Sequence, residues 1–178
     1  MITLDYQSAQ DLPAVEKLLD QAFGADRYMK ASYRLRAGVE AKPELSFTAK
    51  MDGVLYGTLR FWQAQLFDQA SGTVRPILFL GPIAISRDKQ GLGIGAKLLS
   101  HGLRRAKAMK IGPVFLVGSC VYYQRYGFSD LGGRSITLPD GQDGDRLLVL
   151  GCPDLHDLPQ AGLLLPDNGL SESAYTAA

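Results

Sequence analysis

The sequence from Ser86 to Ala108, SRDKQGLGIGAKLLSHGLRRAKA, directly follows an apolar run, ILFLGPIAI, that spans Ile77 to Ile85. A buried strand that leads through a glycine-rich turn into a helix is typical of phosphate-binding sites. Glycine lets the backbone approach an anion, and the free amides at a helix start attract it. The segment GLGIGA (residues 91–96) fits the dinucleotide-binding pattern G-x-G-x-x-G/A and comes near a P-loop. This stretch alone therefore leaves the kind of phosphate compound open.

The rest of the chain argues against both of these nucleotide sites. A dinucleotide-binding fold needs an acidic residue about 20 positions further on, at the end of the next strand. That strand ends in FLVGSC (residues 115–120), which contains no Asp or Glu. A P-loop needs a glycine and a Ser or Thr where this chain has Ala96 and Leu98. A glycine-rich turn that binds no ligand stays as a third alternative.

Composition sets further limits on the function. The 178 residues are 46% hydrophobic and 21% charged, which is ordinary for a single globular domain. Nineteen basic and 18 acidic residues give a net charge of +1, so nothing favours nucleic acid or a membrane surface as a partner. Two cysteines (Cys120 and Cys152) and two histidines (His101 and His156) make a metal site or a disulfide framework unexpected. No targeting segment is recognised near Met1, so we expect a cytoplasmic protein.

The pattern of apolar and turn residues predicts a mixed α/β order. Helix-start signals at Ser8, Asp11 and Pro13 introduce the first helix, and Asp52-Gly53 predicts a hairpin turn. The expected strands span residues 2–6, 44–51, 54–66, 77–85, 113–118, 134–138 and 145–151, and the expected helices span residues 8–24, 27–38, 92–109 and 119–127.

Three of these expectations concern the less regular parts of the chain. The last two strands are expected to form a hairpin through residues 139–145. From Pro153 onward the chain is expected to be loop-like, with a frayed tail over residues 168–178. The helix over residues 27–38 is expected to expose most of its basic side chains, which are Arg27, Lys30, Arg34 and Arg36.

The spacing Gln90-x-x-Gly93-x-Gly95 resembles the acyl-CoA pyrophosphate loop, Q/R-x-x-G-x-G/A, of the GNAT superfamily of N-acetyltransferases. The segment YYQRYGF (residues 122–128) is similar to the family's F-Y-x-x-x-G-F segment, which lies on a short helix beside the thioester. With LGPIAI before the loop, the chain looks most like a group of bacterial predicted acetyltransferases. The resemblance runs from the first strand to about Gly151. It implies a GNAT domain over residues 1–152, with a mixed sheet of about seven strands and helices on both faces, and a C-terminal extension over residues 153–178 that packs on it or trails from it.

The resemblance also implies how acetyl-CoA would bind. Backbone groups of Ile83, Ala84 and Ile85 are expected to pair with the pantetheine arm like an added strand. Arg87 and Lys89 are expected to reach the 3′-phosphate or the diphosphate, with a solvated surface role as the alternative for each. The amides expected to bind the diphosphate belong to Gln90, Gly91, Leu92, Gly93, Ile94, Gly95 and Ala96.

In the implied reaction an amine attacks the thioester carbonyl, which an amide near Ile85 would polarise. Tyr123 is the expected general acid, because a phenol with a pKa near ~10 is protonated at neutral pH and can donate to the departing thiolate. Simple packing of the aromatic rings is the alternative, and Tyr122 and Tyr126 are alternative acids. The general base is unassigned, since the strands beside the loop contain no acid and Glu44 and Asp68 are only distant candidates.

The sequence therefore predicts an N-acetyltransferase that moves the acetyl group of acetyl-CoA directly to a primary amine in a ternary complex. A small-molecule acceptor is favoured, because the net charge is near zero and the chain has no partner domain. The alternatives are an acyl-CoA-binding or sensor protein with little turnover, and a protein or peptide N-acetyltransferase. No metal, nucleic acid or membrane is expected. Four points are left open. They are a homodimer, a longer acyl donor, a covalent or redox role for Cys120 instead of simple packing, and an acceptor rim formed by the basic segment 27–38.

Overall fold

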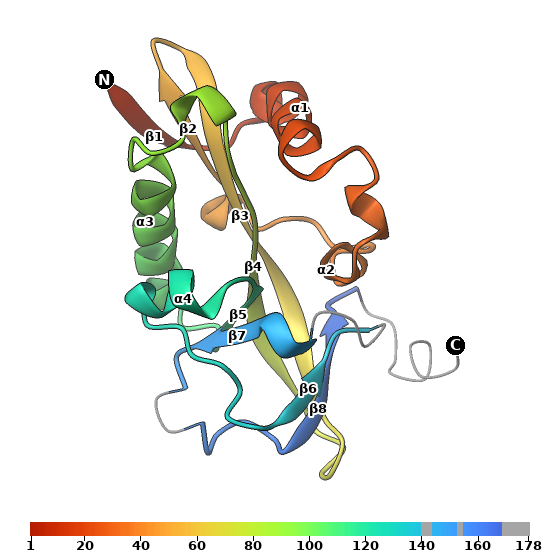
Figure 1. Ribbon diagram of the computed structural model, residues 1–178. Coiled ribbons are helices and arrows are strands. Elements are labelled where there is room, and N and C mark those ends of the chain that lie inside the picture. Colours follow the sequence, from red (N-terminus) through yellow and green to blue (C-terminus); the bar gives the residue numbers. More distant parts are fainter. Residues whose placement is uncertain (140–143, 153–154, 169–178) are drawn as a thin grey trace. The chain divides into compact units, whose positions relative to one another are not determined.

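Figure 1 shows the computed structural model, which describes residues 1–139, 144–152 and 155–168. This part of the chain contains eight strands in one mixed, mostly antiparallel sheet, paired in the order β1-β2-β3-β4-β5-β7 with β8 paired to β3 and β6. The strands are β1 (Ile2–Tyr6), β2 (Phe47–Met51), β3 (Val54–Asp68), β4 (Val74–Ile85), β5 (Val114–Val117), β6 (Ser135–Thr137), β7 (Leu147–Leu150) and β8 (Ala161–Pro166). The α-helices are α1 (Leu12–Phe23), α2 (Ala31–Arg34), α3 (Ile94–Met109) and α4 (Cys120–Tyr123). The α/β class is confirmed, with eight described strands where about seven were expected.

Backbone contacts divide the chain into two compact units, and β3 and β4 contribute residues to both. The first unit comprises Met1–Tyr28, Ala41–Phe61 and Leu80–Lys110. The second comprises Met29–Glu40, Trp62–Phe79 and the described residues from Ile111 onward. The division at residue 152 suggested by the family resemblance stays a prediction.

In the first unit, local signals in the sequence set the ends of α1 and of the β2–β3 hairpin. Ser8 and Asp11, the two predicted caps, form a capping box around the 3₁₀ turn Ala9–Asp11 that leads into α1, and Pro13 lies in the first turn of α1. Asp52 and Gly53 both have positive φ values, 50° and 79°, as a tight hairpin turn with a right-handed twist requires. These local predictions are confirmed.

Successive side chains of β4 point to opposite faces of the sheet in the first unit. Ala84 packs in one cluster with Val15, Leu18 and Leu19 of α1. The Ile85 side chain lies on the other face, near Gly57, where α3 packs. Helices therefore cover both faces, as expected.

In the second unit, two predictions about strand pairing are wrong. The strands β6 and β7 do not form a hairpin with each other, because β7 pairs with β5 and β6 pairs with β8. The chain after Pro153 is not entirely loop-like, because β8 pairs antiparallel to residues 64–68 of β3. Both errors have the same cause, because the pairing of strands far apart in sequence depends on which apolar faces are buried in the folded chain. Residues 140–143 of the predicted turn and residues 169–178 of the predicted tail lie outside the described residues.

The expectation of a solvated basic helix over residues 27–38 is wrong for Arg27 and Arg36. A 3₁₀ turn (Arg27–Met29) and the short α2 replace the helix, and these two side chains are only 1% and 9% exposed. In the first unit, Arg27 is ion-paired with Glu16 and Asp20. In the second, Arg36 lies over the Tyr33 ring at 4.3 Å from its centroid. Carboxylate and aromatic partners offset the cost of burying these cations.

Candidate active site

The glycine loop between β4 and α3 adopts a backbone conformation that favours glycine. Gly91 and Gly93 have φ values of 81° and 75°, in the left-handed region where most side chains are strained. A Cβ atom added at either position would meet no atom within 4 Å. Glycine is therefore needed at these two positions for the backbone conformation and not for close packing, and the space beside them is open to a ligand.

The same loop presents a row of backbone amides. Within the described residues, no acceptor is found for the amides from Gly91 to Ala96, and the first bond at the start of α3 runs from Lys97 N to Gly93 O at 3.0 Å. Gly93 is the N-cap residue and has no side chain to satisfy them. An anion is stabilised here by these amides and by the dipole of a 16-residue helix.

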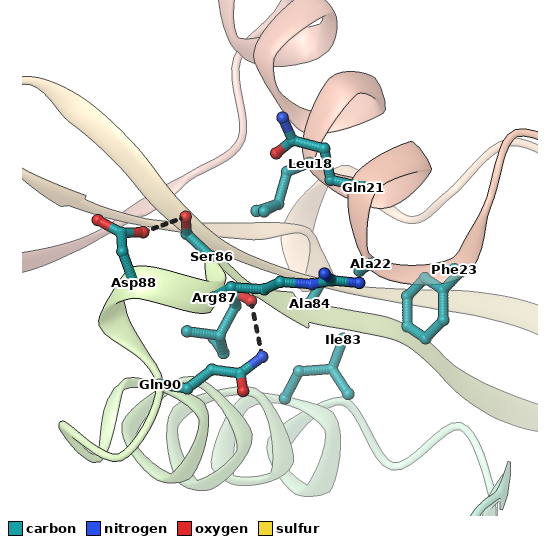
Figure 2. Close-up of a pocket in the computed structure, with 11 residues that line it drawn as sticks. Leu18, Gln21, Ala22, Phe23, Ile83, Ala84, Ser86, Arg87, Asp88 and Gln90 are labelled. Atoms are coloured by element: carbon teal, nitrogen blue, oxygen red, sulfur yellow. Dashed lines mark hydrogen bonds between the residues drawn. The ribbon is translucent and has the colours of Figure 1, made fainter.

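The end of β4 extends beyond its ladder with β5, next to this loop. The parallel ladder between β4 and β5 joins Leu78 to Val114 and Phe79 to Phe115. Residues 83–85, expected to pair with the pantetheine arm, lie beyond the ladder on β4. At the strand end, the Gln90 side-chain amide donates to the Ile85 carbonyl oxygen at 3.5 Å, a long hydrogen bond that Figure 2 shows as a dashed line.

A pocket of about 610 Å³ lies between the C-terminal half of α1 and the end of β4 (Figure 2). Five of its lining residues were predicted as donor-binding residues, namely Ile83, Ala84, Ile85, Arg87 and Gln90. Sequence reasoning missed Leu18, Gln21, Ala22, Phe23, Ser86 and Asp88. The available signal is the apolar C-terminal half of α1, where Ala22 is exposed and Phe23 is half-buried.

The polar groups in and beside this pocket differ in whether they already have a hydrogen-bond or ion-pair partner in the protein. The Ser86 hydroxyl donates to Asp88 Oδ1 at 2.5 Å, and this bond lowers the pKa of the Asp88 carboxyl. Lys89 Nζ lies 3.4 Å from Asp88 Oδ2 and 5.1 Å from the centroid of the Tyr56 ring. Asp88 is therefore ionised and partnered, which makes it a weak base. The Arg87 side chain crosses the pocket toward Ala22 (Figure 2).

In the second unit, Tyr123 lies at the end of α4 in a cluster of aromatic rings. Burial, with a smaller contribution from Tyr122 and Tyr126, raises the pKa of Tyr123 to about 12. Its ring stands edge-to-face with Tyr122 at 4.9 Å and with Phe128 at 5.9 Å. No described residue hydrogen-bonds to its hydroxyl group. The phenol is therefore protonated at neutral pH and available to an external acceptor.

Gly118 makes room for the Tyr123 ring. A Cβ atom added at Gly118 would overlap this ring, whereas the φ of Gly118 lies outside the left-handed region. The glycine is therefore needed for close packing and not for backbone conformation.

The two distant candidates for the general base gain no support. Asp68 accepts hydrogen bonds from Ser71 and from the Ala70 amide, and these bonds lower its pKa, so it stabilises a turn. Glu44 is exposed in the 3₁₀ turn Pro43–Leu45. Neither residue lines the pocket, and the base remains unassigned.

Both cysteines are free thiols, with Cys120 half-buried and Cys152 buried, and a role for Cys120 stays a prediction. No cluster of three or more His, Cys, Asp or Glu side chains suited to a metal ion occurs in residues 1–139, 144–152 and 155–168. Over the same residues, the helices are too short or too polar to cross a membrane.

Residues 12–128 match the Acetyltransferase (GNAT) family. This chain belongs to that family. A relative, the uncharacterised N-acetyltransferase YjhQ of Escherichia coli K12, is 30% identical over 129 residues, which are 72% of this chain and 68% of YjhQ. The resemblance seen in the glycine loop and in YYQRYGF is thereby confirmed, and the protein is an acyltransferase of the GNAT type.

Solved GNAT structures share the fold. The GNAT-family N-acetyltransferase YhbS of Escherichia coli, in complex with CoA, has a TM-score of 0.70 at 20% identity and covers 93% of this chain and 89% of its own. A GNAT acetyltransferase of Brucella melitensis, in complex with acetyl-CoA, has a TM-score of 0.58 at 26% identity and covers 72% of this chain and 83% of its own. CoA and acetyl-CoA are thus ligands of these two relatives.

Proposed function

We propose that this protein transfers the acetyl group of acetyl-CoA to a primary amine of a small-molecule acceptor by direct attack in a ternary complex. The observation that carries the proposal is the row of free amides from Gly91 to Ala96 at the start of α3. An array of this kind binds a diphosphate without needing a metal-binding hydroxyl group or a ribose-binding acid. The loop contains neither a metal-binding hydroxyl group nor a ribose-binding acid, and CoA binding requires neither.

The donor would lie along the end of β4. The diphosphate would accept hydrogen bonds from the amides of residues 91–96, because the open side of Gly91 and Gly93 allows close approach. The pantetheine arm would extend along Ile83, Ala84 and Ile85, whose backbone groups lie beyond the ladder to β5. Backbone pairing of this kind adds a strand-like segment to a free edge.

The chemistry would proceed by nucleophilic attack of the neutral amine on the thioester carbonyl. A C–N bond forms, an amide near Ile85 stabilises the developing oxyanion, and the C–S bond then breaks. Tyr123 would donate its proton to the departing CoA thiolate and regain a proton from water before the next turnover. With its pKa raised to about 12, the phenol is a weak acid, so its main effect is a hydrogen bond that strengthens as the thiolate forms.

The amine proton would leave to water. Asp88 is ionised and already hydrogen-bonded to Ser86, so it is not a competent base. Attack by the free-base fraction of the acceptor is therefore favoured, which predicts that the rate rises with pH toward the pKa of the acceptor amine. The same missing base favours one rival function, an acyl-CoA-binding or sensor protein with little turnover.

A binding titration and a transfer screen test the proposal. By calorimetry, acetyl-CoA should bind with 1:1 stoichiometry, whereas NADH and ATP should bind far more weakly. With a panel of small amines and of peptides with free N-termini or lysines, thiol release should be fastest with small amines. Preference for NADH or ATP would disprove the donor site, and binding without transfer would support the sensor. Faster transfer to peptides would make this a protein-modifying enzyme.

Location in the cytoplasm stays a prediction, whereas the sequence left open a homodimer and a longer acyl group on the donor. A comparison of acetyl-CoA with longer acyl-CoA donors in the transfer screen tests the last one.

A further inference from the structure

Among the residues that line the pocket beside α1, Arg87 carries the positive charge. Figure 2 shows its side chain running across the pocket toward Ala22, at the end of α1, while Gln90 lies nearer to α3. Within the described residues, no carboxylate or carbonyl group ion-pairs with this guanidinium or accepts a hydrogen bond from it. Its charge is therefore available to a ligand that enters the pocket.

The nearby acidic groups already have other partners. Asp88, in the same turn, is ion-paired with Lys89 Nζ at 3.4 Å and also accepts a hydrogen bond from Ser86. On α1, Glu16 and Asp20 are ion-paired with the buried Arg27. Among the described residues that line the pocket, Arg87 is therefore the charged side chain without an ion-pair partner, and Leu18 and Phe23 give the same pocket an apolar wall.

The guanidinium and the amide row are directed toward different helices. The pocket is lined by residues of α1 and also by Ile85 and Gln90, and within it the Arg87 side chain runs toward Ala22 on α1 (Figure 2). The amides of residues 91–96 lead into α3, on the face to which Ile85 points. Arg87 is therefore not directed at the amides that would hold the donor's diphosphate.

We propose that Arg87 binds an anionic group of the acceptor, so that the acceptor is an amine that also carries a carboxylate or a phosphate. A guanidinium forms paired, charge-assisted hydrogen bonds with either group. The side-chain amide of Gln21 in the same lining adds a hydrogen-bond donor. This inference rests on the proposed acetyl transfer and names the class of acceptor. It assigns Arg87 to the acceptor and not to a phosphate of CoA, the partner that the family resemblance implies.

The test uses pairs of probes that differ in charge. L-amino acids are compared with their carboxamides, and phosphoethanolamine is compared with ethanolamine, with thiol release from acetyl-CoA as the readout. The enzymes are the wild type, Arg87→Ala, Arg87→Lys and the control Arg104→Ala, which removes an exposed arginine of α3. A carboxamide lowers the pKa of its amine and so increases the free-base fraction. Preference for the acid therefore cannot arise from amine reactivity.

For the wild type we expect kcat/KM to be at least tenfold higher for the anionic member of at least one pair. Arg87→Ala should abolish this preference mainly by raising KM for the anionic acceptor, Arg87→Lys should retain part of it, and Arg104→Ala should behave as the wild type does. The carboxylate pair and the phosphate pair show which anion is used.

Binding of CoA and of dephospho-CoA to the same variants separates the acceptor from the donor. Unchanged dissociation constants in Arg87→Ala support the proposal. Weaker binding of both donors in Arg87→Ala shows a diphosphate contact, weaker binding of CoA alone shows a 3′-phosphate contact, and either result overturns the proposal. No transfer to any anionic amine also overturns it, even if uncharged amines react. Failure to bind acetyl-CoA at all would instead disprove the proposed function.

Discussion

Tyr123 shows how a single residue acquires its chemistry from its neighbours. A free phenol has a pKa near ~10, but burial among the rings of Tyr122 and Phe128 raises the value to about 12. Gly118 is needed for this packing, because any side chain there would displace the ring. The hydroxyl group is thus kept protonated and without a partner among the described residues.

Replacing Tyr123 by Phe retains the ring and removes the hydroxyl group. We expect kcat to fall by about 100-fold or more, which is the usual contribution of a positioned acid, while the dissociation constant of acetyl-CoA changes less than about twofold. Steady-state kinetics and calorimetry measure the two quantities. Tyr126→Phe is the matched variant, and a larger loss of kcat there than in Tyr123→Phe would identify Tyr126 as the acid.

At the scale of elements, the glycine loop and α3 form a unit whose conformation follows from local sequence. The left-handed φ of Gly93 ends the extended segment and begins the helix, and residues such as Leu98, Leu99 and Ala106 bury one side of it. The helix was expected at residues 92–109 and is observed at Ile94–Met109. Periodicity and glycine placement act over a few residues, so this element could be predicted closely.

Gly93→Asn tests whether the open space beside the loop holds the donor. Asn tolerates the left-handed region, and a Cβ atom here meets nothing within 4 Å, so the free energy of unfolding should fall by less than about 1 kcal/mol. Acetyl-CoA affinity should nevertheless fall at least tenfold, because the new side chain occupies the approach to the amides. Gly53→Asn is the control, since this hairpin glycine has a similar φ of 79° and equally open space. Equal affinity in both variants would contradict the proposed diphosphate site.

The strands of the second unit show that strand pairing between distant segments could not be predicted from the sequence. The run AGLLLP of β8 is short and apolar, yet its pairing with Gln65 and Leu66 of β3 joins segments about 100 residues apart. Likewise β7 has Leu147, Leu148 and Val149 buried and pairs with β5 instead of its neighbour in sequence. Alternation and turn signals identify strands, but pairing at this distance depends on the whole sheet.

At the scale of the whole molecule, a charged network connects distant segments of the first unit. Glu16 on α1 accepts hydrogen bonds from Arg60 of β3 at 2.9 Å and from the buried Arg27, and Arg60 also binds Gln7 at 2.8 Å. Burial alone would raise the pKa of the Glu16 carboxyl, but the two arginines outweigh it and lower this pKa. The ionised carboxylate therefore stabilises the folded state.

Because the pKa of Glu16 is lower in the folded state, its contribution is complete above its ordinary value of 4.5 and is lost as the pH falls through the folded value. We expect Glu16→Gln to reduce the free energy of unfolding by about 1–2 kcal/mol at pH 7, a modest loss because solvent partly screens this half-buried carboxylate. The difference from the wild type should narrow between about pH 5 and pH 3. Urea unfolding across this range measures both effects. Glu44→Gln, which changes an exposed carboxylate, should show neither, and a constant difference at all pH values would contradict the linkage.

The sequence by itself determined the glycine loop, the helix after it, the caps of α1 and the family of the protein, because each depends on residues close together in the chain. Only the tertiary structure decided the pocket between α1 and β4, the burial of Arg27 and the raised pKa of Tyr123. These features arise from contacts between segments far apart in sequence, which set burial, dielectric environment and charge pairing. The donor loop could therefore be predicted from the sequence. The direction of the Arg87 side chain, on which the proposed class of acceptor rests, is seen only in the folded chain.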